Sequence, residues 1–188
     1  MRLWPMVSRD RTALDALVLI GLIGALSGCS MPFPVYSVSG KNVASLRSMS
    51  KPIKLGQFAG DQKSVSCRLQ PISPEDGSTF ASYIRNAFNE EMIIAGVNVG
   101  DGAPELRGTL KNIDVDCGII SASWIIEMEF SVGDRAPFTV KTVREFDGNY
   151  FGQVVFSRAY TAFVPSVQAF VNDALNHPSL QAAAGGVR

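Results

Sequence analysis

The sequence predicts an α+β domain, a two-layer sandwich in which two helices pack on one face of a mostly antiparallel sheet of four to five strands. Two helices are indicated because apolar residues recur every three or four positions over residues 79–95 and again over residues 160–175. The sheet is indicated by three consecutive segments between residues 105 and 146 in which apolar and polar residues alternate. Each element has one apolar side, so the two layers are expected to bury these sides against each other.

The first helical stripe has the regular spacing of a packed helix face, which favours a core role over a cofactor site. Thr79 and its neighbours offer N-caps, and Gly96 stands where a C-cap is expected. The apolar face is predicted to contain Phe80, Ile84, Ala87, Phe88 and Met92, and the residues off that face are predicted to be Arg85, Asn89, Glu90 and Glu91.

Five extended segments are expected, and the last three form an antiparallel meander with one solvated face. Within the third segment the alternation changes phase, which predicts a β-bulge at Lys111 and Asn112. Gly118 and the sequence from Gly133 to Arg135 supply hairpin turns. The five segments are residues 51–58, 64–69, 105–117, 119–132 and 137–146.

The second helical stripe follows a loop predicted over residues 147–157. Pro165 either begins a new helix in its first turn or kinks a longer helix. Asn176, His177 and Pro178 end the helix, and residues 181–188 are expected to form a flexible tail.

The N-terminus has the features of a secretory signal peptide. An apolar run over residues 16–25 follows the basic residues Arg2, Arg9 and Arg11, and it is too short to span a bilayer as a helix. The run ends in Leu26-Ser27-Gly28-Cys29, which resembles the lipobox of bacterial lipoproteins. The alternatives are an uncleaved anchor, or an ordinary signal peptide with a cysteine near its cleavage site.

The lipobox resemblance implies that a signal peptidase recognises Leu26, Ser27 and Gly28 and cleaves before Cys29. It also implies that the Cys29 thiol carries a diacylglycerol and that the mature protein carries fatty acids such as palmitate, enough to hold it permanently on a membrane. Ser30 follows the cysteine where an Asp commonly signals inner-membrane retention, which implies the periplasmic face of the outer membrane.

Removing residues 1–28 leaves 160 residues, with 14 basic and 15 acidic side chains and a net charge of −1. The sequence has no basic stripe, so nucleic acid is not an expected partner. Residues 29–51 are rich in serine, which predicts a lipidated flexible tether. Within it, the spacing of Val43, Leu46 and Met49 is compatible with one helical turn that docks on the domain. The single folded domain is predicted over residues 52–180.

Once Cys29 is assigned to lipid, Cys67 and Cys117 remain as an even pair in an oxidising compartment. Such pairs usually form disulfides, so we expect this bond. The alternative is two buried, unpaired thiols.

The sequence predicts neither enzymatic activity, nor a cofactor, nor a metal site. His177 is the single histidine and lies in a helix-ending sequence, where contact with the helix dipole is expected over catalysis. Glu127 and Glu129 share one strand face, as do Asp114 and Asp116, but a solvated strand face has the same appearance as a carboxylate site.

The layout is similar to that of small Gram-negative lipoproteins of the YajG type and of ABC-transport auxiliary lipoproteins. The similarity rests on a helix ending in Ala95-Gly96, the strand sequence Leu106-Arg107-Gly108-Thr109-Leu110, the strand containing Trp124 and a C-terminal helix. These families imply a periplasm-facing or transport-accessory role and supply no catalytic residues.

Two functional hypotheses follow. The first is a non-catalytic accessory or assembly factor that binds an envelope protein complex through a sheet face or edge, or through the aromatic residues Tyr150 and Phe151. The alternative for these two residues is that they only cover the rim of the core. The alternative is a carrier that holds an apolar ligand such as a lipid between the helices and the sheet.

Overall fold

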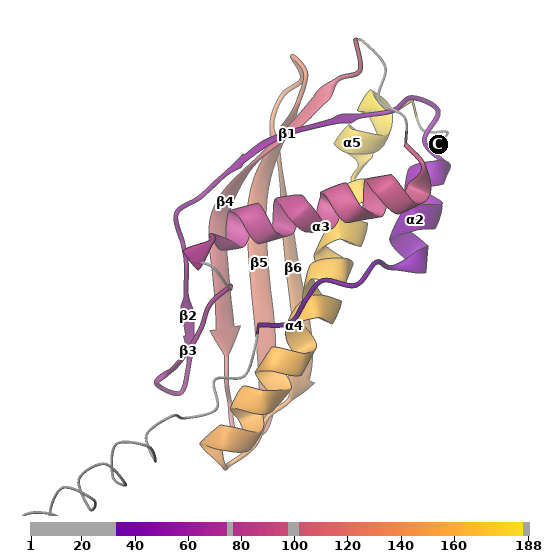
Figure 1. Ribbon diagram of the computed structural model, residues 1–188. Coiled ribbons are helices and arrows are strands. Elements are labelled where there is room, and N and C mark those ends of the chain that lie inside the picture. The colour runs from indigo at the N-terminus through magenta and orange to yellow at the C-terminus, as the bar shows by residue number, and fades with distance from the viewer. Residues whose placement is uncertain (1–32, 75–76, 98–101, 186–188) are drawn as a thin grey trace, which may run out of the picture. The chain divides into compact units, whose positions relative to one another are not determined.

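A four-stranded mixed sheet forms one layer of the protein, with the strand order β1-β4-β5-β6. The computed structural model describes residues 33–74, 77–97 and 102–185 (Figure 1). The predicted lipid-attachment residue Cys29, the predicted peptidase-recognition residues and the signal peptide lie outside these ranges. The strands are β1 (Lys54–Ala59), β4 (Glu105–Asp116), β5 (Ser121–Val132) and β6 (Phe138–Asp147).

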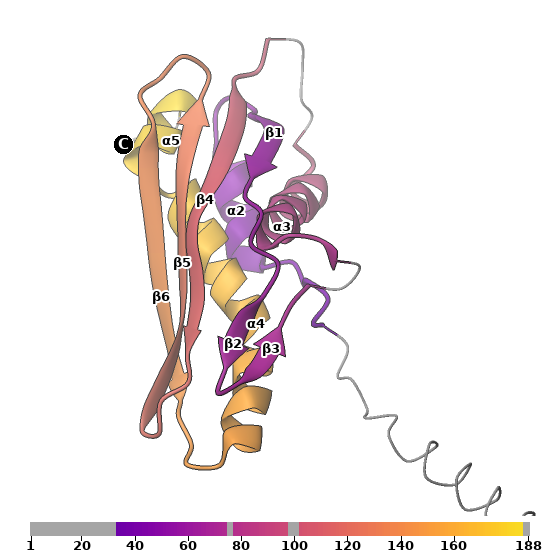
Figure 2. The same cartoon turned by 90° about the vertical axis from the view of Figure 1, so that its left-hand side faces the viewer.

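Two helices, α3 (Phe80–Ala95) and α4 (Gly152–Leu175), cover one face of this sheet (Figure 2). The predicted two-layer α+β sandwich is confirmed. β4, β5 and β6 form the predicted antiparallel meander, whereas β1 runs parallel to β4. The chain between β1 and β4 contains α3 and a short antiparallel hairpin made of β2 (Val65–Cys67) and β3 (Gln70–Ile72).

Local sequence determines the ends of α3. The Thr79 hydroxyl accepts a hydrogen bond from the Ser82 amide at 3.1 Å, and the Ser82 hydroxyl accepts one from the Thr79 amide at the same distance, a capping box. Gly96 has a φ of 71° and ends the helix in the left-handed conformation that glycine tolerates. The pairing of β4 with β5 shifts between Leu110 and Asn112, which confirms the predicted bulge.

α4 begins earlier than predicted and passes through Pro165 as a single helix. The predicted loop over residues 147–157 is therefore wrong for residues 152–157, because Val155 and Ala159 are fully buried and hold the first turns on the core. The Ser166 hydroxyl donates to the Ala162 carbonyl at 2.7 Å beside the proline. By length and composition α4 meets the criteria for a membrane span, but its buried stripe packs against β5 and β6.

Residues 33–51 are part of the folded domain, so a flexible tether is a wrong prediction for this stretch. Phe33 and Tyr36 are buried, and α2 (Gly40–Arg47) packs on α3 and α4. Packing overrides the serine-rich composition here because these apolar side chains complete the core. The predicted flexible tail is also wrong up to residue 185, since α5 (Pro178–Ala183) buries Leu180 and the Ala184 carbonyl accepts from the Lys51 amide at 2.8 Å.

Glu91 holds this N-terminal segment, residues 33–47, on α3. Contrary to the prediction for α3, its side chain is fully buried. Its Oε1 atom accepts hydrogen bonds from the Tyr36 hydroxyl at 2.6 Å, the Ser39 amide at 2.8 Å and Asn42 Nδ2 at 3.1 Å. The pKa of Tyr36 is raised above its ordinary value, mainly by burial and to a smaller extent by the hydrogen bond to Glu91. Burial likewise raises the pKa of Tyr83, whose hydroxyl donates to the Pro34 carbonyl at 2.9 Å.

Aromatic rings fill much of the space between the two layers. Phe163 of α4 lies 4.8 Å from Trp124 of β5 and 4.9 Å from Phe33, measured between ring centroids. Phe130 of β5 lies 5.9 Å from Phe88 of α3. The Trp124 indole N–H donates to the Ala159 carbonyl at 2.8 Å, which satisfies the polar atom of the largest buried side chain.

Candidate binding surface

Three loops meet at one end of the domain and carry exposed apolar side chains. They are the β2–β3 turn, the β4–β5 loop and the β6–α4 loop, which lie together at the lower end of Figure 2. Leu69 is 97% exposed and Ile120 is 92% exposed, which is unusual for large apolar residues in a folded domain. We call this surface the apolar tip, and it consists of Leu69, Ile119, Ile120, Tyr150, Phe151 and Val154.

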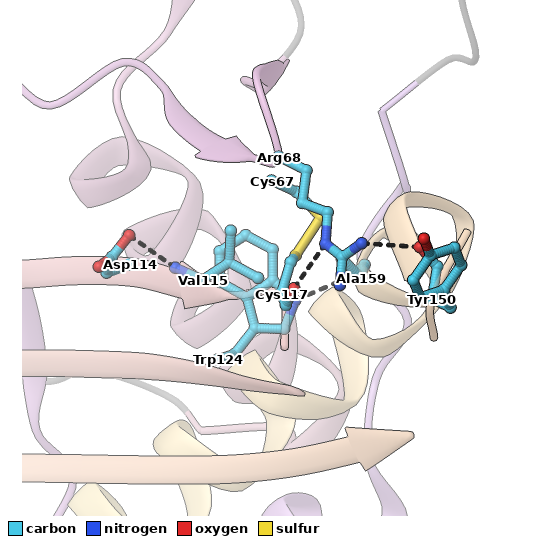
Figure 3. The surroundings of a disulfide bond; sticks show 8 residues. All are labelled: Cys67, Arg68, Asp114, Val115, Cys117, Trp124, Tyr150 and Ala159. Atoms are coloured by element: carbon cyan, nitrogen blue, oxygen red, sulfur yellow. Dashed lines mark hydrogen bonds between the residues drawn. A yellow bond between two sulfur atoms is a disulfide. The ribbon is translucent and has the colours of Figure 1, made fainter. Parts of the chain in front are cut away.

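A disulfide between Cys67 and Cys117 joins two of these loops. The bond links the end of β2 to the residue after β4, with Cα atoms 5.5 Å apart (Figure 3). The disulfide predicted from cysteine count and compartment is therefore present. Cys67 is fully buried, so the bond lies beneath the exposed side chains and fixes their base.

Arg68 links all three loops. Its Nε atom donates to the Cys117 carbonyl and its Nη1 atom donates to the Tyr150 carbonyl, both at 2.9 Å (Figure 3). One planar guanidinium thus bridges the β4–β5 and β6–α4 loops from the β2–β3 turn. Because these donors are used by main-chain carbonyls, Arg68 acts here as a structural support for the tip.

The β2–β3 turn presents its leucine at a conformational cost. Cys67 pairs with Gln70, so the turn contains only Arg68 and Leu69, and their φ angles are 46° and 70°. Two positive φ angles in a two-residue hairpin are typical of a type I′ turn, which favours Asn-Gly. A non-glycine residue held there costs about 1–3 kcal/mol and persists when surrounding contacts enforce it. The disulfide and the Arg68 hydrogen bonds supply such contacts.

Two glycines allow the other loops to approach closely. A Cβ atom on Gly118 would lie 2.2 Å from the Ser121 carbonyl oxygen, and one on Gly148 would lie 2.6 Å from the Gly118 carbonyl oxygen. The Asn149 amide donates to the Gly118 carbonyl at 3.3 Å, which ties the β6–α4 loop to the β4–β5 loop. The tip is consequently one connected surface.

The residues considered for catalysis lie elsewhere and have structural partners. Glu129 pairs with Lys111 at 3.3 Å, and Glu127 pairs with Lys141 at 3.6 Å, as exposed or half-exposed ion pairs on the strands. His177 stacks on Phe138 with ring centroids 4.3 Å apart, and its Nδ1 accepts from the Ser179 amide at the start of α5. Among the described residues, no group of three or more His, Cys, Asp or Glu side chains is placed to hold a metal ion.

The sequence predicted part of this surface. Tyr150 and Phe151 are the part that the sequence indicates. The structure connects their loop to the disulfide, because Arg68, which follows Cys67, donates a hydrogen bond to the Tyr150 carbonyl. Leu69, Ile119 and Ile120 were missed. Ile119 and Ile120 were included in a strand pattern that begins only at Ser121, and nothing in the local sequence marks Arg68-Leu69 as a two-residue turn.

The sequence matches no protein-family model and no curated protein. The solved structures to which this chain has a distant likeness include the following two. One is an uncharacterized protein with 12% identity and a TM-score of 0.36, covering 78% of this chain and 93% of its own. The other is the rare lipoprotein B from Shewanella oneidensis, with 14% identity and a TM-score of 0.38, covering 69% of this chain and 95% of its own. At these values neither similarity assigns a function.

Proposed function

We propose that this protein is a non-catalytic lipoprotein, anchored through Cys29 to the periplasmic face of the outer membrane, that binds an envelope protein complex through the apolar tip. The observation that carries the proposal is the tip itself, a set of exposed apolar side chains held in place by a disulfide. The accessory or assembly role of the lipoproteins that its layout resembles fits this activity.

The anchor and the domain are close together in sequence. Phe33, which is buried among aromatic rings, follows Cys29 by four residues. Four residues of extended chain reach at most about 14 Å, so acylation of Cys29 would keep the domain next to the membrane surface. The Cys67–Cys117 disulfide supports an oxidising compartment such as the periplasm.

The construction of the tip favours a protein partner over direct contact with lipid. Insertion into a bilayer requires apolar area but no particular arrangement of side chains. At this tip three loops are instead fixed relative to one another by a covalent bond, two arginine hydrogen bonds and close glycine contacts. A preorganised apolar surface containing Tyr and Phe is typical of protein-binding sites, because rigid anchors lose little entropy on binding.

The packing between helices and sheet does not favour the alternative of an apolar-ligand carrier. Rings from both layers lie 4.8–6.0 Å apart at several points between them, as in a filled core. The proposal therefore places binding on the outer surface.

Photo-crosslinking in native envelopes tests the proposal. A photoreactive residue at Ile120, on the tip, is expected to capture one defined envelope protein. The same residue at Val143, an exposed apolar position on β6, serves as the matched control and should not capture that protein. Crosslinks from Ile120 to phospholipid alone would contradict a protein partner, and loss of palmitate labelling in a Cys29→Ser variant checks the anchor separately.

Leu69→Gly separates binding from folding. Glycine relieves the positive φ at this position, so the free energy of unfolding should rise by about 1 kcal/mol. Removing the exposed leucine should at the same time reduce crosslinking and co-purification of the partner. A damaged fold would lower both quantities, so the opposite changes identify a binding role. Unchanged co-purification would show that Leu69 is outside the interface.

A further inference from the structure

Helix α3 ends in two exposed isoleucines, away from the apolar tip. Ile93 is 66% exposed and Ile94 is 56% exposed, whereas Phe88 on the same helix is fully buried. Figure 1 shows this end of α3 beside α2. Arg47 of α2 donates from Nη2 to the Ile94 carbonyl at 3.2 Å and from Nε to the Ala95 carbonyl at 3.3 Å. An exposed apolar pair therefore lies next to a positive charge.

A hollow of about 280 Å³ adjoins this pair, because Ala95 is one of the residues that line it. Leu46 and Ile53 also line the hollow and are buried, so its floor is apolar. Two basic residues, Arg47 and Lys51, line it as well, and its described lining residues include no acidic side chain. The hollow therefore suits a ligand that has both a negative charge and an apolar part.

The two carboxylates of α3 are directed elsewhere. Glu91 is buried and accepts a hydrogen bond from the Tyr36 hydroxyl. Glu90 lines a separate hollow with Tyr83. Arg47 uses two of its five N–H groups on main-chain carbonyls, so three donors remain for a ligand. Arginine donors and a lysine ammonium are the groups that bind phosphate in proteins.

The proposed lipid anchor brings a membrane within reach of this surface. Phe33, which follows Cys29 by four residues, packs on Tyr83 of α3 with ring centroids 5.4 Å apart. Ile93 lies ten residues beyond Tyr83 on α3, about 15 Å along the helix axis. Acyl chains on Cys29 and the exposed isoleucines are thus able to meet one membrane surface.

We propose that the end of α3 docks on an anionic phospholipid surface. Arg47 and Lys51 hold a headgroup phosphate in the hollow, and Ile93 and Ile94 lie in the interfacial region of the bilayer. Apolar side chains beside basic residues are typical of segments that lie in this region. The inference rests on the Cys29 anchor of the proposed function but not on the apolar tip. Two attachments fix the orientation of the domain and leave the tip free for its partner.

Photo-crosslinking of the acylated full chain in vesicles tests this surface. The vesicles contain phosphatidylethanolamine alone or with about one quarter phosphatidylglycerol, an anionic lipid. A photoreactive residue at Ile94 is expected to capture phospholipid, several-fold more when the anionic lipid is present. Val143, which is 53% exposed, is the matched control and should capture little lipid. Equal yields at the two positions or in the two lipid mixtures would overturn the proposal, as would capture of protein at Ile94 in place of lipid.

Lys51→Gln tests the charge of the hollow. A basic residue near an anionic surface strengthens binding about fivefold, so this variant should lower the lipid yield at Ile94 by about that factor. Lys63→Gln is the matched control, since Lys63 is also exposed and forms no ion pair with a described residue. It should leave the yield unchanged, and thermal unfolding of both variants should match that of the unaltered protein. An unchanged yield in Lys51→Gln would overturn the proposal.

Flotation with the vesicles reports the anchor separately. Protein that does not float contradicts the anchor and this inference together. Protein that floats but captures no lipid at Ile94 contradicts this inference alone.

Discussion

The apolar tip and the N-terminal segment are both irregular regions fixed to the same core, but by opposite means. The tip is held by a disulfide and by hydrogen bonds to main-chain carbonyls, and it exposes its apolar side chains. The N-terminal segment is held by a polar network on the buried Glu91 side chain and buries most of its large apolar side chains, including Phe33 and Tyr36, with Val35 exposed. A region that exposes apolar surface gains little from burial, so it needs a covalent bond to stay ordered.

This comparison predicts that the two regions respond to different perturbations. Reduction should loosen the tip and leave the N-terminal segment in place. Loss of the Glu91 acceptor or high pH should release the N-terminal segment and leave the tip in place.

The largest effect is expected from replacing both disulfide cysteines, Cys67→Ser with Cys117→Ser. The bond closes a loop across a sequence separation of 50 residues, and in the chain-entropy model its loss costs about 4 kcal/mol. Urea unfolding measures the loss, and hydrogen exchange should locate the new mobility in the three tip loops. The unaltered protein under reducing conditions is the control and should behave in the same way. Equal loosening of residues 33–47 would contradict the separation of the two regions.

A somewhat smaller effect, about 3 kcal/mol, is expected for Glu91→Ala, because two buried donors and one half-buried donor lose their shared acceptor. Glu91→Gln keeps an acceptor oxygen and should cost only about 1 kcal/mol. Limited proteolysis should show faster cleavage within residues 33–47 in the alanine variant. If cleavage instead begins in the tip loops, the network does not hold the segment as described.

The smallest effect is a pH dependence above the ordinary tyrosine pKa of 10.0. The pKa values of Tyr36 and Tyr83 are raised in the folded state, mainly by burial. The folded protein therefore keeps protons that the unfolded chain releases, so their contribution to stability is fully present below about pH 10 and declines as the pH rises beyond it.

Thermal unfolding at several alkaline pH values measures this decline. The double variant Tyr36→Phe with Tyr83→Phe should be less stable at neutral pH, because two hydrogen bonds are lost, but its stability should fall less steeply above pH 10. Tyr150→Phe, at the exposed tip, is the matched control and should keep the steep decline. Parallel slopes for all three proteins would contradict this origin of the pH dependence.

Local pattern predicted the elements whose causes are local. α3 followed from a helical apolar stripe with a capping residue and a terminal glycine, and the β4 bulge followed from a change in alternation. Glu91 was assigned to the solvent side, although its spacing of four from Ala87 and seven from Ile84 placed it near the buried stripe. Only the packing of a segment more than forty residues away makes a buried carboxylate acceptable there, because that segment brings three donors.

The candidate binding surface was predictable only in part for the same reason. Exposed aromatic residues after β6 are visible in the sequence, but Leu69 and Ile120 join them only through a turn, a disulfide and an arginine that connect three distant loops.

The sequence by itself determined the α+β class, the main helices and strands, the cysteine pair and the lipobox-like N-terminus, because each depends on residue type, count or short-range period. The tertiary structure alone decided that residues 33–51 belong to the folded domain, that Glu91 is buried, and that the exposed apolar residues form one surface. These properties arise from contacts between residues far apart in the chain, and short-range patterns do not encode such contacts.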